Sequence, residues 1–197
     1  LTYTVQIHPD VKWHDGEKLT TKDVEFTVKL IQAGGEGIPA DLQKFWSGIE
    51  VTSLNETTIQ FVLPEPYAPF LDYLSFGILP EHILAGLTPE EFRNSSFNIQ
   101  PVGSGPFKFD SLITKDEKIT GIKLARNDQF YSQLPNLESV TFMYYPDSSA
   151  AMNAYRTGVV QGISKIDSAA LPQALKETKL NMYTSRLPRL SMVMFNL

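Results

Sequence analysis

The sequence predicts a mixed α/β (α+β) fold in which short strands alternate with short helices. Residues 2–7 alternate apolar and polar side chains, which is the period-2 pattern of a half-buried strand, whereas residues 24–31 carry apolar side chains at helical spacing. Farther along, residues 137–163 have the pattern of a strand, a helix and a second strand. We expect them to form one right-handed β-α-β crossover.

The composition is that of an ordinary globular domain, with 197 residues, 42% of them hydrophobic, and a formal net charge of −5. A mild acidic excess argues against nucleic acid as a partner, because nucleic-acid surfaces gather Lys and Arg. The absence of cysteine excludes disulfides and thiolate metal ligands. Both ends fall inside predicted strands, so we expect the chain to be a fragment of a longer protein.

The N-terminal stretch is the most strongly patterned part of the chain. A short extended run, residues 11–14, follows the first strand and leads into Asp15-Gly16, a pair that favours a tight turn. Thr20 stands three residues before Asp23, which is the spacing of a capping box. We therefore expect a helix of about three turns to begin there.

A β-hairpin is predicted next, from two patterned runs at residues 49–54 and 57–63 that flank a polar turn. Its second strand should direct three apolar side chains into the core, namely Ile59, Phe61 and Leu63. Before the hairpin, we expect Asp41 to cap a short helix that runs through Trp46. After it, residues 67–76 should form a helix, with Phe70, Leu71 and Leu74 at helical spacing.

Residues 101–107 hold two glycines and two prolines, so their backbone must follow a tight and specific path. Thr88 should cap a short helix upstream of this loop, and Asp147 and Asp167 should each cap one downstream. The other elements that we expect are strands at 107–113, 119–126, 137–145 and 159–163, helices at 148–157 and 169–177, and extended segments at 180–183 and 190–197.

Five stretches, in order and at matching spacing, resemble motifs of the family 5 extracellular solute-binding proteins, which feed ABC importers. Trp13-His14-Asp15-Gly16 followed by Leu19-Thr20-Thr21-Lys22-Asp23-Val24 is similar to the family's opening signature. Pro101-Val102-Gly103-Ser104-Gly105-Pro106-Phe107 resembles its Pro-Val-Gly-Thr-Gly-Pro-Tyr. The other three matching stretches are residues 122–127, 147–158 and 194–196. The chain departs from the family pattern at His8, where an Arg is usual, and at residues 159–161, where an acid, an aliphatic residue and Asp are usual.

This resemblance implies a periplasmic-binding-protein-like class II fold, of which the chain would be lobe I with an inserted subdomain, truncated before lobe II. Residues 1–100 would form the inserted α+β subdomain region, and residues 101–197 the β-α-β part leading to the hinge. It also implies an extracytoplasmic protein, periplasmic or held at the membrane as a lipoprotein, that acts as a monomer without a cofactor. Two lobes would close on an oligopeptide or dipeptide, and the closed form would deliver it to an ABC permease.

The resemblance further implies which residues contact the solute. The end of the last strand would lie along the cleft, where Asn196 can donate and accept hydrogen bonds as an added strand would. The ligand-binding residues expected on this basis are Met194, Phe195, Asn196, Leu197 and Ser104. Asn196 could instead brace the hinge, and the loop of Ser104 could serve only as a turn that places the next strand.

Other functions remain open from the residues alone. Asp15 and Glu17 lie beside Trp13 and could act as the carboxylate pair of a glycoside hydrolase, although a turn and helix-start role for this acidic cluster is the simpler interpretation. A ligand-free interaction domain is the other alternative, and nickel complexes or oligosaccharides could replace the peptide. We expect no catalytic residue and no metal site, and we expect the three histidines to be solvated or loop residues.

Overall fold

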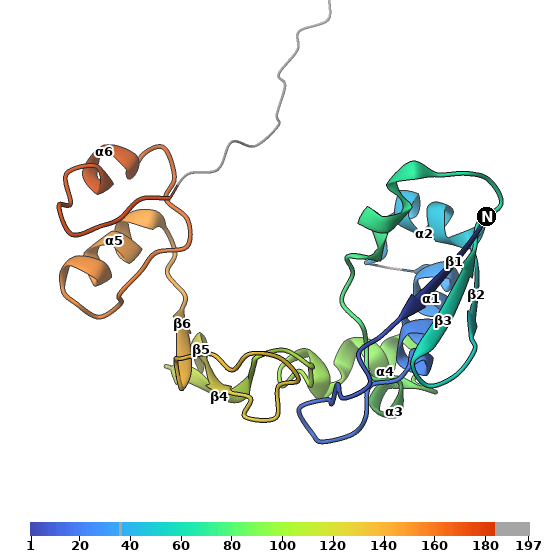
Figure 1. Cartoon of the computed structure of the whole chain (residues 1–197). Coiled ribbons are helices and arrows are strands. Elements are labelled where there is room, and N and C mark those ends of the chain that lie inside the picture. Colours follow the sequence, from blue (N-terminus) through green and yellow to red (C-terminus); the bar gives the residue numbers. More distant parts are fainter. Residues whose placement is uncertain (36, 184–197) are drawn as a thin grey trace, which may run out of the picture. The chain divides into compact units, whose positions relative to one another are not determined.

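The computed structural model describes residues 1–35 and 37–183, and it confirms a mixed α/β chain of short elements (Figure 1). The chain divides into two compact units, Leu1–Phe142 and Met143–Leu197. Among the described residues, no helix combines the length and apolar character that crossing a membrane requires.

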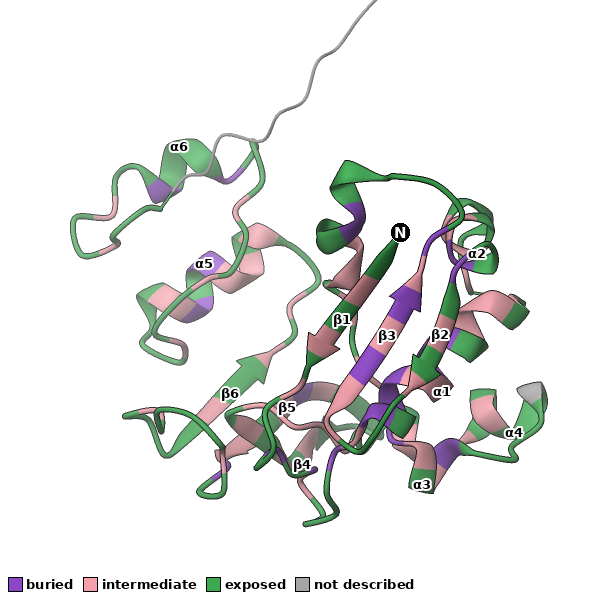
Figure 2. Cartoon of the chain, turned by 45° about the vertical axis from the view of Figure 1, so that its right-hand side comes forward, coloured by how far each residue is buried: buried purple, intermediate pink, exposed green. Residues whose placement is uncertain are grey.

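The first unit begins with a three-stranded antiparallel sheet in the order β1-β3-β2 (Figure 1). Its strands are β1 (Thr2–Gln6), β2 (Glu50–Ser53) and β3 (Thr58–Val62). Burial alternates along each strand, so that Ile59 and Phe61 of β3 are buried and their neighbours are not (Figure 2). The predicted hairpin is confirmed, because β2 and β3 pair in antiparallel register, and Asn55 Oδ1 in their turn accepts hydrogen bonds from two backbone N–H groups.

Helix α1 (Thr21–Ala33) covers the apolar face of this sheet with α2 (Ala40–Ser47) beside it (Figure 1). The predicted capping box is confirmed. The Thr20 side chain accepts from the start of the helix, and Asp23 accepts from the Thr20 N–H at 2.8 Å. The core that forms between helices and sheet consists of Val24, Val28, Trp46, Ile49, Ile59, Phe61, Leu63 and Phe70.

One local prediction in this unit is wrong. Asp41 does not cap α2, which begins after Pro39 without a side-chain cap; Asp41 lies inside the first turn instead. The helix predicted at residues 67–76 is present as a shorter 3₁₀ helix, η1 (Ala68–Leu74). Its Phe70 is buried, whereas Leu71 is 62% exposed.

The unit continues through short helices into a second sheet. These helices are α3 (Glu81–Leu84), α4 (Pro89–Asn94) and the 3₁₀ turn η2 (Ser96–Asn98). The predicted Thr88 cap of α4 is confirmed as a capping box with Glu91. The second sheet has the order β4-β5-β6 and comprises β4 (Phe107–Lys115), β5 (Lys118–Arg126) and β6 (Ser139–Met143).

The second unit contains α5 (Ser148–Arg156) and α6 (Leu171–Ala174). Asp147 caps α5 as predicted, since its Oδ1 accepts from the Ala150 N–H at 2.7 Å, and Gly158 with φ +77° ends the helical stretch. Asp167 accepts from the Ala170 N–H, but it serves the turn before a helix shorter than predicted.

The predicted β-α-β crossover is not formed, because the described residues contain no strand after α5. Val159 and Val160 both donate their backbone N–H groups to the carbonyl of Ala154, at 2.9 and 3.4 Å. These donors close the end of the helix and are not available to a strand ladder. Residues 180–183 carry no regular strand, and the predicted segment 190–197 lies outside the described residues.

Gly34, which ends α1, is expected to be the glycine whose replacement by alanine costs most. Its φ of +71° and ψ of −164° lie in a region that essentially only glycine adopts, at a cost of about 1–3 kcal/mol for other residues. A Cβ there would also overlap the amide of Gln43, which donates to the carbonyl of Gln32 at 3.2 Å. Urea unfolding of G34A should therefore show a lower free energy of unfolding.

The matched control is G48A at the end of α2. Gly48 has a φ of −90°, and its Cβ would meet Pro64 Cγ at 3.5 Å, an ordinary contact. Alanine should be neutral there or stabilise slightly, by at most about 1 kcal/mol, through the unfolded state. Equal losses in the two variants would contradict the role that we assign to Gly34.

Candidate functional site

The Gly- and Pro-rich loop, residues 101–106, is held against the hairpin of residues 11–19 by one histidine side chain. His14 Nδ1 accepts a hydrogen bond from the Gly103 N–H at 3.1 Å, and its Nε2 lies 3.0 Å from the Gly105 carbonyl oxygen. The His14 backbone N–H also donates to the Gly103 carbonyl at 2.8 Å. Three contacts thus join two segments about ninety residues apart in sequence.

A second anchor holds the end of this loop. Asn127, which follows β5 and is buried, donates its side-chain amide to the Gly105 carbonyl at 3.1 Å. Its backbone N–H donates to the Pro106 carbonyl at 2.9 Å. The loop is therefore fixed from both sides, by the hairpin and by the end of β5.

Burial of the His14 imidazole lowers its pKa, because the charged form loses solvation. The Gly105 carbonyl and Asp15 act in the opposite direction, and Lys108 adds to the lowering. The balance keeps the pKa of His14 below its ordinary value. His14 is consequently neutral at pH 7, as its contact with the Gly103 N–H requires.

Ser104 is the only predicted ligand residue that the structure describes, and it lies half-buried in this anchored loop. The other four, Met194, Phe195, Asn196 and Leu197, lie outside the described residues. Whether they meet Ser104 in one site stays a prediction. The structure does show that the segment carrying Ser104 has a fixed backbone path.

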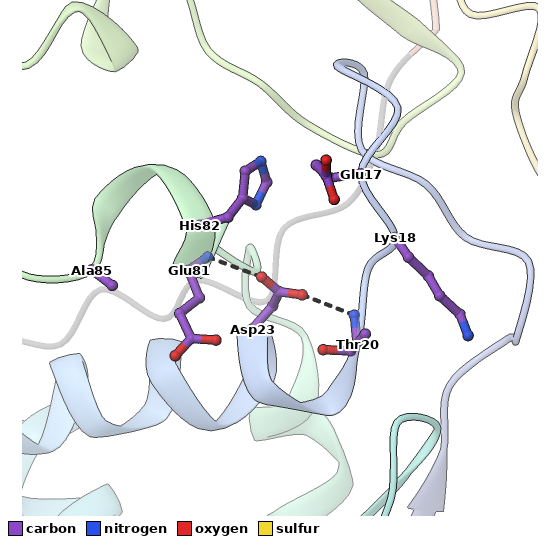
Figure 3. Close-up of a pocket in the computed structure, with 7 residues that line it drawn as sticks. All are labelled: Glu17, Lys18, Thr20, Asp23, Glu81, His82 and Ala85. Carbon is purple, nitrogen blue, oxygen red and sulfur yellow. Dashed lines mark hydrogen bonds between the residues drawn. The ribbon is translucent and has the colours of Figure 1, made fainter.

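An open polar pocket of about 310 Å³ lies near the start of α1 (Figure 3). Asp23 lies between two elements there, since one carboxylate oxygen accepts from the Thr20 N–H and the other from the Glu81 N–H at 2.9 Å. Because both oxygens serve backbone donors, Asp23 joins α1 to α3. The pocket is lined by Glu17, Lys18, Thr20, Asp23, Glu81, His82 and Ala85.

Asp15, the first carboxylate of the hydrolase alternative, is paired with His82 at 2.8 Å. Partial burial acts to raise the pKa of Asp15, but hydrogen bonds from His82 and from the Glu17 N–H outweigh it, so the pKa lies below its usual value. A glycosidase needs a carboxylic acid that keeps its proton near neutral pH. Asp15 has the opposite environment, so it does not suit the role of this general acid.

The expectation of three solvated or loop histidines misses two interactions. His14 and His82 both bond to groups distant in sequence, whereas His8 is exposed and accepts from the nearby Asp10 N–H. Across the described part of the chain, no group of three or more His, Cys, Asp or Glu side chains is placed to hold a metal ion. Asn127 is not among the predicted site residues. The Gly- and Pro-rich loop that it anchors is the sequence feature that points to a residue of this kind.

The family model of bacterial extracellular solute-binding proteins, family 5 (Middle), matches residues 1–197. An ABC transporter peptide-binding protein of Brucella ovis is 34% identical over 163 residues, which cover 82% of this chain and 30% of that protein. The oligopeptide-binding protein AppA of Bacillus subtilis is 32% identical over 162 residues, covering 80% of this chain and 29% of AppA.

Solved structures give the same result. NikZ from Campylobacter jejuni, in complex with Ni(L-His), matches with a TM-score of 0.74 and 28% identity, covering 90% of this chain and 34% of NikZ. AppA from Bacillus subtilis, in complex with a nonapeptide, matches with a TM-score of 0.73 and 29% identity, covering 89% of this chain and 34% of AppA. This chain thus spans about a third of the length of these proteins, and it belongs to the family 5 bacterial extracellular solute-binding proteins.

Proposed function

We propose that this chain is part of the substrate-binding component of an ABC importer, which holds peptide-like solutes between two lobes and delivers them to the permease. The observation that carries the proposal is the family match across residues 1–197. The names of the Brucella ovis and Bacillus subtilis relatives, which are peptide-binding proteins, support it. No bond is made or broken in this function.

A peptide is the solute that we favour, because AppA was crystallised with a nonapeptide and two curated relatives are named for peptides. NikZ, with Ni(L-His), shows that a protein similar to this chain takes a metal chelate instead. Met194, Phe195, Asn196, Leu197 and Ser104 are the proposed contacts. A peptide backbone offers the N–H and C=O groups that an Asn side chain can pair with.

The proposal also covers the oligomeric state, the location, the division of the chain and the closing motion. The protein would act as a monomer outside the cytoplasm, in the periplasm or as a lipoprotein on the outer face of the membrane. Residues 1–100 would form the inserted subdomain region, and residues 101–197 would lead to the hinge. Closure of the two lobes around solute would create the form that the permease recognises.

Native mass spectrometry of the full-length protein, purified gently from its host, tests the proposal. A ladder of peptide masses released on denaturation is the expected result. A single sugar or metal-chelate mass would contradict the peptide assignment but not the transport role. An unliganded protein that hydrolyses an added glycan would overturn the transport role itself.

A matched pair of variants tests the proposed contacts with a nonapeptide probe in calorimetry. Asn196→Ala should weaken binding about tenfold, which corresponds to about 1.4 kcal/mol and to one lost hydrogen bond. Asn136→Ala, at an exposed position in the described structure, should leave affinity unchanged. Equal affinities for both variants and the unmodified protein would show that Asn196 does not contact the peptide.

A further inference from the structure

The two ring contacts of His14 require one protonation state. A backbone carbonyl can only accept, so Nε2, which faces Gly105, must carry a hydrogen. A backbone N–H can only donate, so Nδ1, which faces Gly103, must carry none. Both bonds are satisfied together by the neutral Nε2–H tautomer alone.

A proton added to Nδ1 would point at the hydrogen of the Gly103 N–H. One hydrogen bond would then be replaced by a contact between two donors, at a site where His14 is partly buried. The ring lies close against the loop, since a Cβ built on Gly103 would lie only 3.3 Å from His14 Cε1. The missing side chain at Gly103 is what allows the ring to approach this closely.

We propose that His14 is a proton-operated clasp, which holds the start of the 101–106 loop to the 11–19 hairpin when neutral and loosens it when protonated. The Nε2–H bond to Gly105 survives protonation, as does the bond from the His14 backbone N–H to the Gly103 carbonyl, and Asn127 still holds Gly105 and Pro106. The change is therefore confined to the Gly103 N–H and the peptide bond that carries it. The loop has two states with the same fold around it.

The charged groups around the ring set the range of pH in which the clasp works. Lys108 on β4 disfavours a proton on His14, while Asp15 on the hairpin favours it and is itself paired with His82 of α3. The 101–106 loop contributes no ionisable side chain. Because burial lowers the pKa of His14, the loosened state binds the proton before the clasped state does. Loosening therefore begins as the pH falls through the ordinary range of a histidine and is complete at the lowered pKa of the clasped ring.

Amide hydrogen exchange of Gly103 in the full-length protein, labelled with ¹⁵N-glycine, measures the clasp directly. The Gly103 resonance is identified by its loss in G103A. Relative to intrinsic exchange, protection of this amide should be constant near pH 8, should fall by up to about tenfold per pH unit between the ordinary pKa of a histidine and the lowered pKa of His14, and should level off below that, as expected when one proton is linked to opening. In a uniformly ¹⁵N-labelled sample, the amide of Asn127 should keep its protection.

Variants at the three histidines supply the controls. His14→Asn places a neutral oxygen near the position of Nδ1, so it should keep the bond to Gly103 and abolish the pH response. His8→Gln and His82→Gln should retain the response. A response that persists in His14→Asn, or that disappears in His8→Gln, would overturn the proposal.

The ring nitrogens of the unmodified protein give a second test that does not depend on whether a variant folds. Their ¹⁵N shifts should show an unprotonated Nδ1 at neutral pH, and Nδ1 protonation and Gly103 exchange should titrate together. A protonated Nδ1 at neutral pH would refute the clasp. Neither measurement uses a solute, so the outcome is independent of whether the protein binds peptides.

Discussion

Replacing Trp46 with alanine is expected to lower the free energy of unfolding by about 3–5 kcal/mol, the usual range for a buried Trp. Trp46 is fully buried and forms the centre of an aromatic cluster, with ring centroids 6.1 Å from Phe61, 6.2 Å from Phe70 and 5.4 Å from Phe76. Alanine would remove the whole indole from between α1, α2 and the sheet. Urea unfolding followed by far-ultraviolet circular dichroism measures the loss.

Two further variants give this prediction its controls. Trp46→Phe should cost less than half as much, because a ring remains and because the Trp46 Nε1 is a buried donor without a hydrogen-bond partner among the described residues. Leu71→Ala, on the exposed face of η1, should change stability by no more than about 0.5 kcal/mol. If L71A destabilised the chain as strongly as W46A, the assignment of the core would be wrong.

Asp23→Ala is expected to lower the free energy of unfolding by about 2–6 kcal/mol, because it leaves two backbone donors unpaired at about 1–3 kcal/mol each. Asp23 is 4% exposed, and its two oxygens accept from Thr20 at the start of α1 and from Glu81 at the start of α3. The loss should therefore combine a broken helix cap with weaker attachment of α3. Chemical denaturation at neutral pH measures it.

Asp23→Asn, compared with a control at Asp41, separates the loss of the hydrogen bonds of Asp23 from the loss of its charge. Asparagine keeps one carbonyl oxygen, so one donor stays paired and the loss should be about half that of alanine. Asp41→Asn, an exposed acidic residue in the first turn of α2, is the matched control, with an expected change below about 1 kcal/mol. Equal losses for D23N and D41N would show that charge near a helix start, rather than the two hydrogen bonds, carries the effect.

The features that the sequence predicts well are those set by near neighbours. Thr20 with Asp23, and Thr88 with Glu91, are three residues apart, so the capping pattern contains both partners of each hydrogen bond. Asp41 satisfies the residue preference for a cap but stands two positions inside the helix. A composition rule of this kind cannot locate the first helical residue without a partner to confirm it.

The features that the sequence predicts poorly depend on groups outside the local pattern. The Val159-Val160 pair has the β-branched side chains of a strand, yet the carbonyl of Ala154 takes both of its donors. The partners of His14 lie about ninety residues away, and no local pattern marks them. The sequence therefore indicates Ser104 and its loop as a candidate site. It does not indicate that His14, which fixes this loop, has a structural role.

The alternating burial of the first sheet determines where the chain can change length. Adding one residue within β3, the central strand, would turn each later side chain to the opposite face, so that the half-exposed Val62 would take the buried position of Phe61. The same addition next to Gly35, where a Cβ would meet nothing within 4 Å, changes no such alternation. We therefore expect insertions and deletions among relatives to fall in the connections and the strands to vary by substitution.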